Sequence, residues 1–377
     1  MPVRRLSLIA ALAMLPALTG CGGSQPDAPP PPSREAEAAI ASDGGAPHDA
    51  LGRAIDALFD ADAVGETRAL LIMKRGSVIA ERYGPGFDAG SRLQGWSMSQ
   101  CLTALTIGQL VSDGRLRLNE TASIPAWQRP GDPRGAIILR QLLQMRSGLR
   151  HREDAVPART SDRFRMLFLD GRDDMAAYAE AQPLAAPAGQ AFAISSATGV
   201  ILADLAARAL TDSRDPRVRA ALVSEYMRTR ILEPVGMTST VIGFDRAGTM
   251  IGSSMMEATA RDWARVGELL RHTGSVKGAQ ILPRRWIQFM LAPSPRNPAY
   301  GAGVWLNRPA EKGLPSPLWP GVAPESLFGC LGEQGQAVLG SPDQLLTVVR
   351  LGATAPDKAA ALHDRLGDLL ALFPGYR

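Results

Sequence analysis

Ser97 is the residue of this chain best placed for nucleophilic chemistry, because it opens a helical pattern of apolar residues. A serine hydroxyl attacks a carbonyl only when a neighbouring base takes its proton. One helical turn further on stands Gln100, and a carboxamide has no useful basicity near neutral pH. No lysine follows a serine by three residues, since the lysines are Lys74, Lys277, Lys312 and Lys358. Ser97 is therefore either a nucleophile with an unrecognised base or a helix N-cap, a position that serine favours without chemistry.

His151 is the titratable residue that could replace such a base. It is followed closely by Glu153 and Asp154, which could orient an imidazole. The alternative is a solvated loop histidine with no catalytic role, and we favour it.

The elements that would position these residues follow from hydrophobic periodicity. Residues 67–73 and 77–83 are apolar runs separated by a Lys-Arg-Gly turn, which predicts a β-hairpin. Helices are predicted at 54–58, from 97 to about 112, and at 138–145, 199–209, 218–231, 258–271 and 357–372. Further strands are predicted at 303–306, 336–340 and 345–351.

This order predicts an α/β fold of the α+β type. Strands at both chain ends would form one antiparallel sheet of about five strands, flanked by helices, with a mostly helical region inserted between them. A parallel doubly wound fold would need strands and helices to alternate throughout, and they do not.

The N-terminus has the composition of an export signal. Residues 1–20 contain Arg4 and Arg5, then an apolar run too short to span a membrane, and Cys21 follows at once. This ending resembles a bacterial lipoprotein signal, which implies acylation of Cys21 and anchoring in the cell envelope, at the outer membrane facing the periplasm. The alternative is an ordinary secretory signal with a chance cysteine. Residues 21–48 are rich in Pro, Ala and Gly and predict a flexible tether before a domain at 49–377.

Charge and cysteine spacing exclude several classes of function. The formal net charge is +4, and removal of Arg4 and Arg5 with the signal leaves +2, with no basic stripe for nucleic acid. The three cysteines form neither a zinc cluster nor a CxxC motif. We expect no nucleic-acid partner, no metal and no cofactor.

Several segments resemble the serine beta-lactamase and penicillin-binding-protein superfamily. Nearest is the group of class C beta-lactamases, esterases and 6-aminohexanoate-dimer hydrolases. The matching segments are Gly95 to Leu102, the stretch ending Ser147-Gly148-Leu149, Pro187 to Phe192, Glu233 to Met237, Ala258 to Ala264 and Gly335-Gln336. They keep the family's order and spacing over residues 49 to 352.

The resemblance assigns family positions in which the reactive groups are missing. Ser97 stands at the nucleophile, Gln100 at the catalytic lysine and Ile194 at the tyrosine of the second motif. Ser195 and Ser196 follow as polar residues that could contact a ligand. Cys330 and Gly332 stand at the third motif, where the family has a lysine or histidine anchor followed by a small residue and glycine. Backbone amides at the helix start and on the facing strand would hold an oxyanion.

The resemblance also places Cys101 on the nucleophile helix opposite Cys330 on the facing strand. We expect the two to be close neighbours but mostly unbridged thiols, because a disulfide requires Cα atoms within about 7 Å and converging side chains.

Three functions remain open. The chain is a degenerate enzyme whose cleft binds a peptide, a cell-wall fragment or a small amide or ester; an active serine hydrolase of amide or ester bonds with a non-standard base; or a structural envelope component. Loss of base, acid and anchor together favours the first.

Overall fold

The computed structural model describes residues 29–375. The predicted signal peptide and Cys21 lie outside these residues. The strands are β1 Glu66–Lys74, β2 Ser77–Tyr83, β3 Leu93–Gln94, β4 Val241–Ile242, β5 Met256–Ala258, β6 Ser275–Val276, β7 Ala279–Gln280, β8 Trp305–Leu306, β9 Phe328–Gly332, β10 Gln336–Ser341 and β11 Leu346–Ala353. The α-helices are α1 Arg34–Ala39, α2 His48–Leu58, α3 Ala61–Val64, α4 Ser99–Ser112, α5 Leu139–Leu143, α6 Asp162–Phe168, α7 Met175–Glu180, α8 Ser196–Leu210, α9 Pro216–Met227, α10 Glu233–Val235, α11 Ala260–Arg271, α12 Arg284–Met290 and α13 Ala359–Ala371.

The main sheet combines both ends of the chain, as the sequence predicts. Its six strands follow the order β2-β1-β11-β10-β9-β8, and the pairs are antiparallel. Hydrophobic periodicity predicts no strand at Phe328–Gly332, so the predicted number of about five becomes six. This strand, β9, carries glycine at Gly329 and Gly332, which weakens a β pattern.

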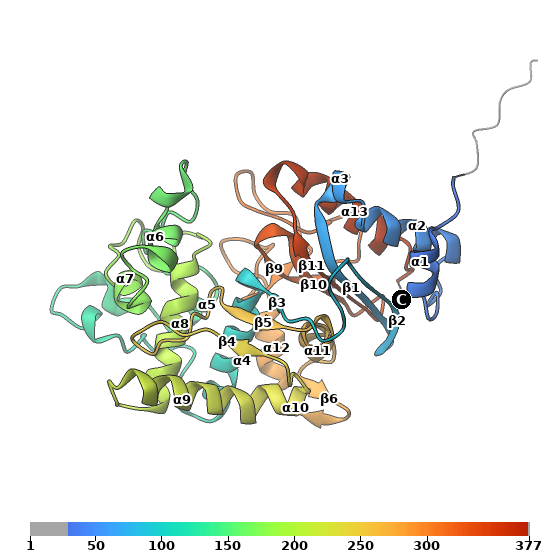
Figure 1. Ribbon diagram of the computed structural model, residues 1–377. Coiled ribbons are helices and arrows are strands. Elements are labelled where there is room, and N and C mark those ends of the chain that lie inside the picture. The colour runs from blue at the N-terminus through green and yellow to red at the C-terminus, as the bar shows by residue number, and fades with distance from the viewer. Residues whose placement is uncertain (1–28, 376–377) are drawn as a thin grey trace, which may run out of the picture. The chain divides into compact units, whose positions relative to one another are not determined.

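Alternation along β1 builds a core on each face of the sheet. Leu70 and Ile72 pack with α2 and α13, whereas Ala69 and Leu71 face the larger core that includes α4, α8 and α11. Figure 1 shows α2 and α13 on one side of β1, with α11 on the other. The N- and C-terminal helices therefore cover one face, and the inserted region covers the other.

The inserted region is mostly helical, as predicted. Helix α4 is buried almost all round and packs against α8. The helix predicted at 218–231 ends as α9 at Met227 and continues as a π-helical turn at Arg228–Leu232. This packing fixes the turn before α4, in which Ser97 lies, against β9.

The structure differs from the predicted tether at residues 33–48. Ser33 caps α1, and its N–H donates to the Asp56 carboxylate of α2 over 2.7 Å. Ala36 is fully buried, and the compact unit begins at Pro32. The alanine-rich segment that suggested a tether forms a short helix that contacts α2 and β2. Within residues 29–375, no helix combines the length and apolar character needed to cross a bilayer.

Candidate active-site cleft

A cavity of about 280 Å³ lies at the start of α4, where β9 passes closest to it. Four of the predicted site residues line it, namely Ser97, Gln100, Ile194 and Gly332. Ser195, Ser196 and Cys330 are not among its lining residues. The structure therefore brings the nucleophile, lysine and tyrosine positions together, as the resemblance implies.

Ser97 sits in a short 3-10 turn, η1 Trp96–Met98, that leads into α4. Its hydroxyl Oγ lies 3.0 Å from both carboxylate oxygens of Glu333, and its backbone N–H donates to Glu333 Oε2 over 3.1 Å. The N-cap alternative is wrong, because the hydroxyl is directed to Glu333 and the start of α4 has no side-chain cap.

Glu333 is the main site residue that sequence reasoning missed. It follows Gly332 directly and begins η6 Glu333–Gly335, so its carboxylate reaches back over Ser97. Arg163 of α6 pairs with Glu333 Oε1 and also with Asp154, at 3.0 Å. The signal that could have found Glu333 is its position beside the third motif. Nothing in the sequence indicates Arg163, which lies 170 residues away.

Gly332 is required by the close approach of β9 to the nucleophile segment. A Cβ at this position would lie 2.2 Å from the backbone oxygen of Gly95. Such an overlap requires the strand or the turn to move. The glycine of the third motif thus has a steric reason to be kept although the catalytic side chains are absent.

Gln100 and Ile194 face the cavity without catalytic groups. The Gln100 side chain is only 8 % exposed, and no residue between 29 and 375 makes a hydrogen bond with its carboxamide. Ile194 is half-buried. The phenol of Tyr300 also borders the cavity, and burial raises its pKa, so this phenol stays protonated at neutral pH.

Cys101 and Cys330 form a disulfide, so the prediction of unbridged thiols is wrong. Their Cα atoms are 6.1 Å apart, within the range that a bridge requires. The close approach of β9 at Gly332 brings the strand near enough to α4. The bridge cross-links the two elements that form the cleft, and it includes Cys330, which the resemblance assigns to the position of the family's anchor.

His151 is neither a solvated loop residue nor a base for Ser97. Its side chain is 1 % exposed, and its Nε2 lies 3.0 Å from Glu153 Oε2. Glu153 also accepts hydrogen bonds from the N–H of Ser196, at 2.8 Å, and from its hydroxyl. Burial alone would raise the pKa of Glu153, but His151 and Ser196 outweigh it and hold this pKa below its ordinary value.

Ser195 and Ser196 stabilise the start of α8. The Ser195 hydroxyl accepts from the N–H of Thr198 over 3.2 Å, which is an N-cap contact. The N–H and the hydroxyl of Ser196 both donate to the Glu153 carboxylate. The geometry therefore gives both serines structural contacts, and Ser196 orients the carboxylate of Glu153, which lines the cavity.

The fold and this cleft define a protein of the serine beta-lactamase and penicillin-binding-protein type. The chain belongs to the beta-lactamase family, whose sequence profile matches residues 55–372. This confirms the resemblance seen in the motifs.

Individual relatives agree with that assignment. The chain is 27 % identical over 233 residues to a 6-aminohexanoate-dimer hydrolase of Paenarthrobacter ureafaciens, an alignment that spans 60 % of this chain and 57 % of that protein. The fold is similar to that of a protein described as a 6-aminohexanoate-dimer hydrolase from Bacillus anthracis, with TM-score 0.66, 22 % identity and coverage of 84 % and 81 %. A penicillin-binding-protein homologue from Caulobacter crescentus has TM-score 0.60, 17 % identity and coverage of 85 % and 98 %.

Proposed function

We propose that this protein is a catalytically degenerate member of the family whose cleft binds a ligand without turning it over. One observation carries the proposal: the Glu333 carboxylate is seated on both the hydroxyl and the backbone N–H of Ser97. The N–H at this position is a donor that the family mechanism needs for the oxyanion.

A carboxylate at this point opposes acyl transfer in two ways. It occupies an N–H that would stabilise the tetrahedral intermediate, and loss of one such donor typically costs about 10²- to 10³-fold in rate. It also places a negative charge where the intermediate develops one. The missing base at Gln100, the missing phenol at Ile194 and the disulfide at Cys330 act in the same direction.

Covalent labelling tests the proposal directly. The purified protein is incubated with a fluorophosphonate probe, with Ser97→Ala and a denatured sample as controls. We expect no labelling above either control and no Ser97-dependent hydrolysis of nitrophenyl acetate. Stoichiometric modification mapped to Ser97 would overturn the proposal.

A second candidate is an active hydrolase in which Glu333 is the base. The 3.0 Å contacts between Ser97 Oγ and the carboxylate favour it, because carboxylates serve as general bases at such distances. Glu333→Gln separates the two: a base would be lost, so Ser97-dependent turnover would disappear. If Glu333 only blocks the site, the wild-type protein has no Ser97-dependent turnover, and Glu333→Gln cannot reduce it.

We also propose that the protein is anchored in the bacterial envelope through acylated Cys21, at the outer membrane and facing the periplasm. The order of basic residues, apolar run and cysteine supports this. Expression of the full chain in a Gram-negative host should place it in the membrane fraction, and Cys21→Ala should release it. An unmodified Cys21 in a wild-type protein that is wholly soluble in the periplasm would contradict the proposal.

A further inference from the structure

We propose that the ligand of this cleft is an amphiphilic cation, in which a primary ammonium group is joined to an apolar body. The inference rests on the proposed function, because it names the class of molecule that the same cleft binds. The ammonium group would lie at Glu333 and Asp154, and the apolar body would lie in the larger cavity next to them.

The first observation is the charge of the cleft lining. Three carboxylates border it, those of Glu153, Asp154 and Glu333, against the single guanidinium of Arg163. The resemblance assigns a cationic or polar anchor to the position of Cys330, suited to a carboxylate ligand. Here that position is a disulfide, so the charge preference of the cleft is reversed.

The carboxylates are placed to accept a further cation. The Asp154 side chain is 82 % exposed and that of Glu333 is 30 % exposed, so both retain access to the open side of the cleft. Arg163 already pairs with both of them and has little capacity left for an anionic ligand. An incoming carboxylate would meet three like charges, whereas an ammonium group could join the existing pairs.

The second observation is the free carboxamide of Gln100. It faces the same cavity, is more than nine-tenths buried, and has no hydrogen-bond partner among the described residues. This carboxamide makes no intramolecular hydrogen bond within the described residues and lines the cavity, so it is available to a polar ligand atom there. It points to an occupant independently of the acidic residues.

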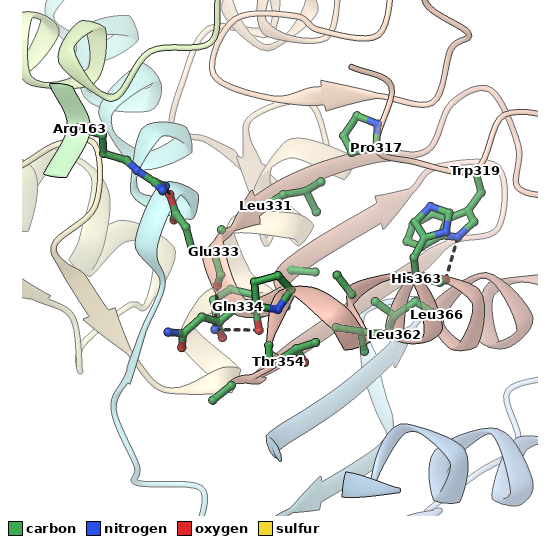
Figure 2. A pocket seen from close by; sticks show the side chains of 18 residues that line it. Arg163, Pro317, Trp319, Leu331, Glu333, Gln334, Thr354, Leu362, His363 and Leu366 are labelled. Atoms are coloured by element: carbon green, nitrogen blue, oxygen red, sulfur yellow. Dashed lines mark hydrogen bonds and ion pairs between the residues drawn. The ribbon is translucent and has the colours of Figure 1, made fainter. Parts of the chain in front are cut away.

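The third observation is an adjoining cavity of about 780 Å³, which is in the size range of small-molecule sites. Both cavities are bordered by Leu331, Gly332 and Glu333. Figure 2 shows Arg163 and Glu333 directed toward each other at one end and Trp319 beside His363 at the other. The Trp319 ring stacks on His363 at 4.6 Å, and Leu362 and Leu366 of α13 complete an apolar wall.

The neighbouring cavities thus combine an acidic site with an apolar one. An apolar body removed from water in the larger cavity supplies non-directional binding energy, and the charged end fixes orientation. A neutral apolar molecule would bind only through the apolar cavity. An anionic amphiphile would be repelled by the carboxylates of the acidic site.

A matched series of eight-carbon probes tests this inference with the full-length protein. Octylamine, octan-1-ol and octanoate are titrated by calorimetry at pH 7 and low ionic strength. We expect octylamine to bind about tenfold more tightly than octan-1-ol, which corresponds to one hydrogen bond between the ammonium group and a carboxylate. Octanoate should bind more weakly than the alcohol.

Variants then assign the charge effect. Glu333→Gln and Asp154→Asn should each bring octylamine to within about threefold of octan-1-ol, while Glu311→Gln, an exposed residue that lines neither cavity, should leave the difference unchanged. Because the Asp154 side chain is largely exposed, its substitution should not disturb the packing of the core, and this variant should fold.

The outcomes of these binding titrations can be distinguished from those of the labelling experiment that tests the proposed function. Equal affinity for octylamine and octan-1-ol, preference for octanoate, or no binding of any probe would overturn the inference. Labelling of Ser97 by a fluorophosphonate would overturn the proposed function, whatever the probes show.

Discussion

Carboxyl groups are buried in two regions of the molecule, and the surroundings act on them in opposite ways. In the cleft, Glu153 accepts hydrogen bonds from Ser196 and contacts His151, which hold its pKa low. In the helical region, Glu180 at the end of α7 lies near Asp204 of α8, and burial and that neighbouring charge raise the pKa of Glu180 to about 8.

The difference shows that burial alone does not decide the role of a carboxylate. Asp204 forms ion pairs with the guanidinium groups of Arg208 and Arg219. Glu180 therefore stays protonated and neutral at pH 7. The cleft carboxylates have donors and an open cavity beside them. Of these two regions, the cleft is therefore the one that offers negative charge to a ligand.

The two regions also differ in covalent support. The Cys101–Cys330 bridge ties α4 to β9 at the cleft, whereas α7 and α8 are held by packing. Four variants test these contrasts, in order of decreasing expected effect.

Removal of the bridge should have the largest effect. Cys101→Ala with Cys330→Ala should reduce the free energy of unfolding by about 4 kcal/mol, because a cross-link between residues separated by 229 positions strongly restricts the unfolded chain. Denaturant unfolding measures this. A wild-type protein that unfolds at the same denaturant concentration with and without reductant would contradict the assigned bridge.

Release of the Ser97 amide should have the next largest effect. Gln100→Lys with Ile194→Tyr restores the family side chains but leaves Glu333 on the oxyanion donor, so we expect only weak esterase activity. Addition of Glu333→Ala should raise nitrophenyl acetate hydrolysis about 100-fold over the double variant. The rate is measured against the same variant carrying Ser97→Ala. Full activity in the double variant would show that Glu333 does not block the site.

Glu180→Gln should stabilise the protein at alkaline pH relative to the wild type. The unfolded state releases the proton near pH 4.5, whereas the folded state keeps it to about pH 8. The wild-type stability therefore falls as pH rises across this interval, and the amide removes that fall. Thermal unfolding at pH 5, 7 and 9 measures it. A parallel pH dependence in variant and wild type would exclude a neutral Glu180.

Glu153→Gln should have the smallest effect and the opposite pH dependence. It removes a charged acceptor for Ser196 and should cost about 1.5 kcal/mol at pH 7. The pKa of Glu153 is lowered on folding, so its contribution is present above the unfolded pKa and is lost as pH falls through the folded value. The difference between variant and wild type should therefore shrink in acid. A difference that grows as the pH is lowered would contradict it.

The sequence by itself determined the family and the α+β sheet built from both chain ends, and it predicted that the family's reactive groups are missing. Periodicity is local, so β1, β2, β10 and β11 were recognisable from their own residues. Gln100 and Ile194 were informative because fixed motif spacing identified their positions, and their side-chain chemistry followed from residue type alone.

Only the tertiary structure decided what replaced those groups. Glu333 contacts Ser97, from which it is separated by 236 positions in the sequence, and Arg163, from which it is separated by 170. No local sequence pattern encodes such contacts. The disulfide depended on a separation of 6.1 Å that the close packing of β9 on α4 sets. His151 was placed wrongly because its polar neighbours suggested solvent, whereas the fold buries it on Glu153. The residue type at a position indicates which catalytic groups its side chain lacks. Long-range packing decides which side chains contact one another in the cleft.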